Sequence, residues 1–96
     1  MVNWSLPAKK DLKNIHDFIA YDSKVYAKKV SQEFIEKSEK LEEFPKMGRM
    51  VPELSDLNIR ELIIYSYRLI YEIRPNNIEV LTIIHGRQNF NENFLR

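Results

Sequence analysis

The sequence predicts an α+β domain: a strand, an antiparallel helical hairpin and then three antiparallel strands, with both helices on one face of the sheet. Apolar residues recur with a period of about 3.6 up to residue 44 and with a period of about 2 beyond residue 58. Two prolines and a glycine in "PKMGRMVPEL" (45–54) separate the two halves as an irregular connector. A length of 96 residues is sufficient for one such domain and too short for a second hydrophobic core.

The first half begins with a short strand. In "VNWSL" (2–6) apolar and polar residues alternate, which predicts one buried side. Pro7 fits the first position of a helix that runs to about Tyr21. Its apolar stripe is formed by Ala8, Leu12, Ile15 and Ile19.

A second, longer helix follows "DSK" (22–24) and ends before Pro45. Its apolar positions have helical spacing and are Tyr26 or Ala27, Val30, Phe34, Leu41 and Phe44. We expect the two helices to pack as an antiparallel hairpin.

The residue pattern in the second half of the sequence predicts three strands. "IRELIIY" (59–65) and "YRLIYEI" (67–73) are joined by a tight turn near Tyr65 and Ser66, and "RPNN" (74–77) leads to "IEVLTIIH" (78–85). Alternation places Tyr67, Leu69, Tyr71 and Ile73 on one face of the middle strand, and Arg68, Ile70 and Glu72 on the other. If the helices cover the first set, Arg68 lies on the open face, where a ligand would bind.

Composition and charge argue against several classes of function. The chain contains no cysteine and two isolated histidines, so we expect neither disulfides nor a metal site, and no spaced acidic cluster or phosphate-binding glycine loop indicates a cofactor. No apolar run approaches the roughly 18 residues of a membrane span, and the first charges follow the N-terminal apolar patch, unlike a secretory signal. We therefore expect a cytoplasmic protein without a membrane partner or a small-molecule cofactor.

The cations are divided by position. All nine lysines lie in residues 1–46 and all six arginines in residues 49–96, so the arginines belong to the predicted sheet half. Guanidinium is a planar fork that binds phosphate or carboxylate in a fixed geometry. Both glycines precede an arginine, in Gly48-Arg49 and Gly86-Arg87, and His85 ends the last strand beside the second pair.

Structural roles are the alternative for the same residues. Arg68 can pair with Glu61 or Glu72 across strands, and a histidine at a strand end is commonly a hydrogen-bonded surface residue. The strand register decides whether Arg60 or Glu61 shares a face with Arg68, and the sequence leaves this open.

Five motifs, in this order and spacing over nearly the whole chain, resemble the RelE/ParE superfamily of bacterial toxins from type II toxin–antitoxin modules, which act in plasmid stabilisation and growth control. The motifs are "P-A-x-x-D-L", "P-x-x-G-R-x-V-P-E-L", "R-E-L", "Y-R-L-I-Y" and "H-G-R". The resemblance implies two helices packed on a small antiparallel sheet, in agreement with the periodicity.

RelE-type members are ribosome-dependent messenger RNA endonucleases that need no metal and use the ribose 2′-hydroxyl as the nucleophile. This chemistry requires a base, an acid and cations for the phosphorane. Of the family's set only the "Y-R-L" arginine is matched, by Arg68; the other positions fall on Ile59, Glu61, Gln88 and a residue near Phe94. A substituted catalytic set would use Arg68, with Arg60 and Arg87 as cations and His85 or Glu61 as proton carriers.

ParE-type members lack that set and resemble non-catalytic poisons of DNA gyrase. The "G-R-x-V-P-E-L" and "H-G-R" motifs are closer to this class, so the resemblance favours a ParE-like inhibitor of gyrase, with the ribosome and messenger RNA as the alternative target. The expected target-binding residues are then Arg49, Arg68, Arg87 and Gln88. Either class implies a cognate antitoxin. We expect it to cover Arg68 and its neighbours with acidic or apolar residues, and to use the groove between hairpin and sheet or an exposed sheet edge.

Overall fold

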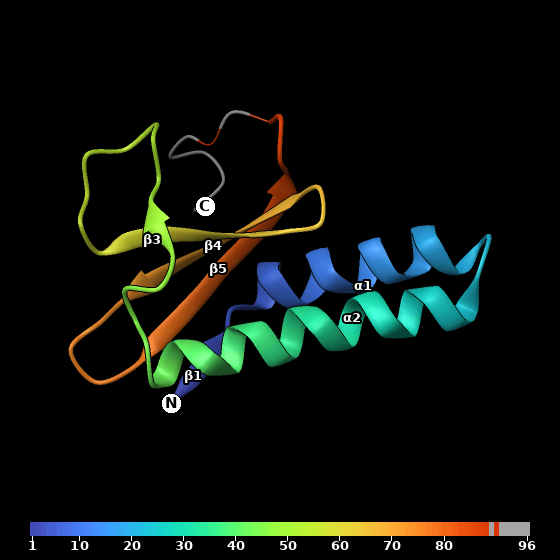
Figure 1. Ribbon diagram of the computed structural model, residues 1–96, viewed down its shortest axis with the longest axis horizontal. Helices are drawn as coiled ribbons and strands as arrows, with labels where there is room; N and C mark the ends of the chain where they lie inside the picture. The colour runs from blue at the N-terminus through green and yellow to red at the C-terminus, as the bar shows by residue number, and fades with distance from the viewer. Residues whose placement is uncertain (89, 91–96) are drawn as a thin grey trace.

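The computed structural model describes residues 1–88 and residue 90. It is an α+β fold in which two helices lie side by side on one face of a five-stranded sheet (Figure 1). The elements, in chain order, are β1 (Val2–Trp4), α1 (Leu6–Ala20), α2 (Lys24–Glu39), the 3₁₀ turn η1 (Lys40–Glu42), β2 (Arg49–Met50), β3 (Ile59–Ile64), β4 (Tyr67–Ile73) and β5 (Ile78–His85). The predicted fold class is confirmed.

The sheet has the strand order β1-β5-β4-β3-β2. The three predicted strands pair antiparallel as expected, and β3 and β4 are joined at Tyr65 and Ser66. Two pairings were not predicted: β1 runs parallel to β5 at one edge, and the two-residue β2 lies antiparallel to β3 at the other. The N-terminal strand and the connector thus provide the two edges of a sheet whose centre is β4.

Two apolar clusters lie on opposite faces of the sheet. The cluster under the helices includes Ala8, Val30, Phe34, Leu69 and Tyr71. The second cluster lies on the face away from the helices, which we call the far face, and consists of Val51, Ile59, Ile70, Ile84 and Phe90. The far face therefore has a small core of its own, to which Val51 and Leu54 of the connector and Phe90 contribute.

Two element boundaries differ from the prediction. Leu6 was expected in the first strand, but it begins α1 and is exposed, because Ser5 caps the helix by accepting a hydrogen bond from the Ala8 amide. The second helix was expected to reach Phe44, but α2 ends at Glu39 and continues as a 3₁₀ turn that buries Leu41 and leaves Phe44 exposed. Such tightening of the last turn is common at helix ends.

A β-bulge in β5 shapes the contact between α1 and the sheet. Ile70 pairs with Thr82 while Tyr71 pairs with Val80, so Leu81 is the extra residue. The Ser5 hydroxyl donates a hydrogen bond of 2.9 Å to the carbonyl of Leu81. The bulge thus anchors the first turn of α1 to the middle of β5.

Candidate functional site

Arg68 lies on the far face, as the alternation in β4 predicted, but this face is not open. The residue is only 5% exposed. Its neighbours on the same face are the apolar residues of the second cluster, and Glu53 of the connector and the Gln88 backbone bind it from above. The expectation of an accessible arginine was wrong, because sequence alternation indicates a face but not what a connector places over it.

Every nitrogen of the Arg68 guanidinium has an acceptor. Nε donates to Glu61 Oε1 at 2.8 Å, Nη1 donates to Glu53 Oε2 at 2.7 Å and to the carbonyl of Gln88 at 2.8 Å, and Nη2 donates to Glu53 Oε1 at 2.7 Å. Nη2 also lies 2.6 Å from Glu61 Oε1. A phosphate could bind this guanidinium only by displacing one of these partners.

The strand register shows which residue of β3 shares a face with Arg68. Ile63 pairs with Arg68 and Glu61 pairs with Ile70, so Glu61 points to the far face and Arg60 to the other. Glu61 is fully buried and its second oxygen accepts a hydrogen bond of 2.6 Å from Arg49 Nε. We call Arg49, Glu53, Glu61 and Arg68 the arginine cluster; its two cations balance its two carboxylates.

The pKa values of two members of the cluster, Glu53 and Arg68, are shifted in the direction expected for a stable ion pair. The hydrogen bonds from Arg68 lower the pKa of Glu53 from 4.5 to about 2, with a further contribution from the Phe90 amide. The hydrogen bonds that Arg68 donates to Glu53 raise the pKa of Arg68 still further above neutrality. Both groups are therefore charged at physiological pH, and neither is available to transfer a proton.

Arg60 and Gly48 belong to a second set of contacts, made with the connector. Arg60 Nη1 donates to the carbonyl of Gly48 at 3.0 Å. The hydroxyl of Tyr71 accepts from the Gly48 amide at 2.9 Å and donates to the carbonyl of Pro45 at 2.7 Å. A Cβ at Gly48 would lie 2.5 Å from the carbonyl oxygen of Glu61, so only glycine fits this approach.

The "H-G-R" residues lie at the end of β5. His85 is exposed, and its ring packs edge to face with Tyr67, a residue of the helix-covered face. The Gly86 amide donates to the carbonyl of Ser66, and a Cβ there would lie 2.9 Å from that oxygen. Arg87 and Gln88 are exposed, although the carbonyl of Gln88 binds Arg68.

The residues expected to form a ribonuclease site thus lie in different parts of the molecule. Arg68 and Glu61 are buried together on the far face, Arg60 binds the connector, and His85 and Arg87 lie at the strand end. The position near Phe94 lies outside the described residues. In the described part of the chain no base and acid flank an accessible cation, which is the arrangement that 2′-hydroxyl attack requires.

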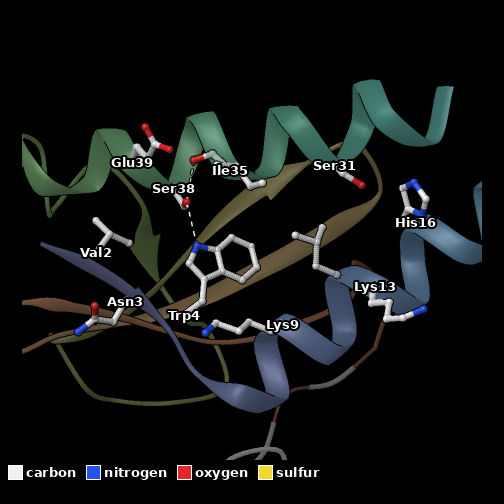
Figure 2. Close-up of a pocket in the computed structure, with 11 residues that line it drawn as sticks. Val2, Asn3, Trp4, Lys9, Lys13, His16, Ser31, Ile35, Ser38 and Glu39 are labelled. Carbon is white, nitrogen blue, oxygen red and sulfur yellow. Dashed lines mark hydrogen bonds between the residues drawn. The ribbon is translucent and has the colours of Figure 1, made fainter. Parts of the chain in front are cut away.

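A groove of about 830 Å³ lies between β1 and the two helices (Figure 2). The Trp4 indole forms its floor and donates a hydrogen bond of 3.2 Å to the Ser38 hydroxyl of α2. Lys9 and Lys13 line the side formed by α1, and Ile35 lines the opposite side. The groove therefore combines an apolar floor with cations on one wall.

The edges of this groove carry unused polar groups. The Ser31 hydroxyl is buried and has no hydrogen-bond partner among the described residues. β1 is the edge strand of the sheet, so its outer side is not paired within the described chain. An unpaired strand edge of this kind is a surface to which another chain can add by backbone pairing.

Comparison with known proteins identifies the family. The profile of the ParE toxin of the type II toxin–antitoxin system parDE matches residues 2–90. The chain belongs to the ParE toxin family. A solved structure titled "Chromosomal ParDE TA system from P. aeruginosa" has a TM-score of 0.72 and 21% sequence identity, with 88% of this chain and 92% of the other chain covered, which shows a shared fold. No curated protein matches the sequence.

In this ParE-family chain the motifs that indicated the family form buried contacts. Glu53 of "P-E-L", Glu61 of "R-E-L" and Arg68 of "Y-R-L" meet in the arginine cluster. Sequence reasoning missed Glu53, although it lies within one of the five motifs. It also missed Asp11 of "P-A-x-x-D-L", whose carboxylate binds β5. An acidic residue inside a motif was the available signal in both cases.

The described residues show neither a metal site nor a membrane-spanning helix. No group of three or more His, Cys, Asp or Glu side chains is placed to hold a metal ion. No helix in that part of the chain is both long enough and apolar enough to span a membrane.

Proposed function

We propose that the chain is a cytoplasmic toxin that inhibits DNA gyrase by binding to it, without catalysing a reaction of its own, and that a cognate antitoxin neutralises it. Membership of the ParE family supports the toxin role. The observation that carries the non-catalytic assignment is the saturation of Arg68, whose three guanidinium nitrogens all bind acceptors within the chain. A ribonuclease would need this cation free to bind the scissile phosphate.

The target-binding surface is proposed to include the exposed polar residues near the end of β5. Arg87 and Gln88 are accessible there, whereas Arg68 is not. Arg49 is a further candidate, since its side chain is 63% exposed even though Nε binds Glu61. Arginine is enriched among residues that dominate binding energy, so we expect Arg87 to contribute more than Gln88.

Purified gyrase provides the direct test. Adding the chain to gyrase and closed circular DNA should inhibit supercoiling and cause cleaved DNA to accumulate, and induction in growing cells should cause chromosome breaks and an SOS-type response. Arg87→Ala should lower the potency about tenfold, which corresponds to about 1.4 kcal/mol of binding free energy. The matched control is Arg74→Ala, which removes an exposed arginine at the opposite end of the β4–β5 hairpin.

The alternative target predicts a different result. Rapid arrest of translation with cleaved messages, and no effect on supercoiling by purified gyrase, would refute the proposal in favour of a ribosome-dependent ribonuclease. In that case Arg68→Ala should abolish cleavage in a variant that remains folded.

We further propose that the antitoxin occupies the groove shown in Figure 2. Arg68 is already covered by the chain itself, so it does not need the antitoxin cover that the sequence suggested. The groove fits an amphipathic segment whose apolar side chains contact Trp4 and Ile35 and whose carboxylates face Lys9 and Lys13. A direct ion pair with Lys13 would compete with its present pair with Asp17.

Titration with the antitoxin tests this assignment. Lys9→Glu and Ile35→Glu should each weaken binding at least tenfold, because the first reverses a charge on the groove wall and the second places a charge in its apolar part. Lys28→Glu is the control, since Lys28 is an exposed lysine of α2 outside the groove. Equal affinities for all three variants would exclude the groove as the antitoxin site.

A further inference from the structure

The core on the far face of the sheet is closed by two straps that are distant in sequence. The first strap is residues 51–54 of the connector, and the second is Gln88 together with Phe90. Val51 and Phe90 are almost fully buried, and Leu54 packs beside them. They cover Ile59, Ile70 and Ile84, so these three isoleucines would face water if both straps moved away.

The backbone hydrogen bonds of Val51, Leu54 and Gln88 hold these three residues only loosely to the sheet. The Val51 amide donates to the carbonyl of Ile59 at 3.3 Å, which is a long bond. The Leu54 and Gln88 amides donate within local turns, to the carbonyls of Val51 and His85. These three residues therefore depend on side-chain contacts to remain in place.

The Arg68–Glu53 pair binds both straps. Glu53 belongs to the first strap, and its Oε2 also accepts a hydrogen bond of 2.8 Å from the Phe90 amide of the second. Arg68 donates to the Gln88 carbonyl through the same nitrogen, Nη1, that binds Glu53. The two partners of this pair therefore contact both straps, so the pair links one strap to the other.

The two carboxylates that bind Arg68 are not equivalent. Glu61 is part of β3, is completely buried and is also held by Arg49. Glu53 is carried by an irregular segment, and its side chain is 24% exposed. When the site opens, Glu53 can leave with its strap while Arg68 remains paired with Glu61 in the sheet.

We propose that the Arg68–Glu53 pair is a latch that makes the two straps open and close over the far-face core as one unit, while the helix-covered core stays folded. The open form presents the apolar strip of Ile59, Ile70 and Ile84. This inference concerns the far face alone and does not depend on the identity of the toxin's target.

Amide hydrogen exchange of the full chain under native conditions tests the latch. In Glu53→Gln the amides of Val51 and Leu54 and those of Gln88 and Phe90 should all exchange at least tenfold faster, and by a similar factor, because the straps open together. The Ile83 amide, which donates to Asp11 on the helix-covered side, marks the other core, and in the unmodified chain it should exchange more slowly than the strap amides because the straps open without it. A response confined to one strap, or strap amides that exchange as slowly as Ile83 in the unmodified chain, would overturn the proposal.

Two further variants make the test specific. Glu72→Gln applies the same chemical change to a more exposed pair, Glu72–Arg74, and should leave the exchange of both straps unchanged. Phe90→Ala weakens the second strap alone, and the latch predicts that Val51 and Leu54 also exchange faster. Unchanged rates at these two amides would show that the straps open independently.

Discussion

Asp11 of α1 binds Thr82 and the following residue of β5 with a single carboxylate oxygen. Oδ2 accepts from the Thr82 hydroxyl at 2.6 Å and from the Ile83 amide at 3.0 Å. These residues follow the bulge at Leu81, where the regular ladder is interrupted. The acidic residue of "P-A-x-x-D-L" thus joins the first helix to the sheet at its irregular point.

Asp11→Ala should lower the free energy of unfolding by about 1–3 kcal/mol, because it leaves the buried Thr82 hydroxyl and the Ile83 amide without an acceptor. Urea denaturation followed by circular dichroism measures this change. Asp22→Ala is a matched control, since the Asp22 carboxylate makes no hydrogen bond or ion pair within the described residues. A smaller additional loss when Thr82→Val is combined with Asp11→Ala would confirm that the two side chains are coupled.

Arg68→Met should destabilise the fold by about 3–5 kcal/mol, because it leaves Glu61 buried without its main cation. Arg68→Lys should recover only part of this loss, since one ammonium cannot reproduce the bidentate pair with Glu53. Thermal and urea unfolding of both variants give the comparison.

The control for Arg68 is Arg74→Met. Arg74 is exposed and pairs with Glu72, so its removal should change the free energy of unfolding by less than about 1 kcal/mol. If Arg68→Met were as stable as this control, the arginine cluster would not stabilise the far face. Arg68 would then serve a purpose other than stability.

Gly48→Ala should destabilise the chain by about 1–3 kcal/mol or more, because the new methyl group would overlap the Glu61 carbonyl oxygen at 2.5 Å and the Tyr71 hydroxyl at 2.6 Å. Gly86→Ala provides a graded comparison, since its nearest atom, the Ser66 carbonyl oxygen, lies at 2.9 Å. Chemical denaturation should rank the losses with Gly48 first. The reverse order would mean that the Gly48 backbone can move away from Tyr71.

The local pattern of the sequence was sufficient to predict most of the fold. Periodicity located both helices and β3 to β5, and alternation assigned Arg68 and Leu69 to opposite faces of β4. It was not sufficient for contacts between distant segments. Nothing in "VNW" specifies that β1 lies parallel to β5, because edge pairing depends on the path of the chain around α1 and α2.

The site was predicted less completely, for a related reason. Arg68 was recognised as an unusual cation, and Glu61 was named as a possible partner, but Glu53 lies 15 residues away in an irregular connector. Only the folded connector brings Glu53 to the guanidinium. A motif containing both signs of charge can indicate an internal ion pair as well as a ligand site, and here the geometry supports the internal pair.

Acidification provides a test of the Glu53 contribution with a defined sign. The folded-state pKa of Glu53 is lowered to about 2 from its ordinary 4.5, so its stabilising effect is fully present above pH 4.5 and is lost as the pH falls towards 2. By linkage this loss is at most about 3 kcal/mol.

Glu53→Gln should therefore be less stable than the unmodified chain at pH 6, and the difference should shrink between pH 4.5 and pH 2. The free energy of unfolding, measured with urea at several pH values, checks this. Asp22→Asn is the control, because the Asp22 carboxylate makes no hydrogen bond or ion pair within the described residues. A constant difference between the unmodified chain and Glu53→Gln across this range would show that Glu53 keeps an ordinary pKa in the folded protein.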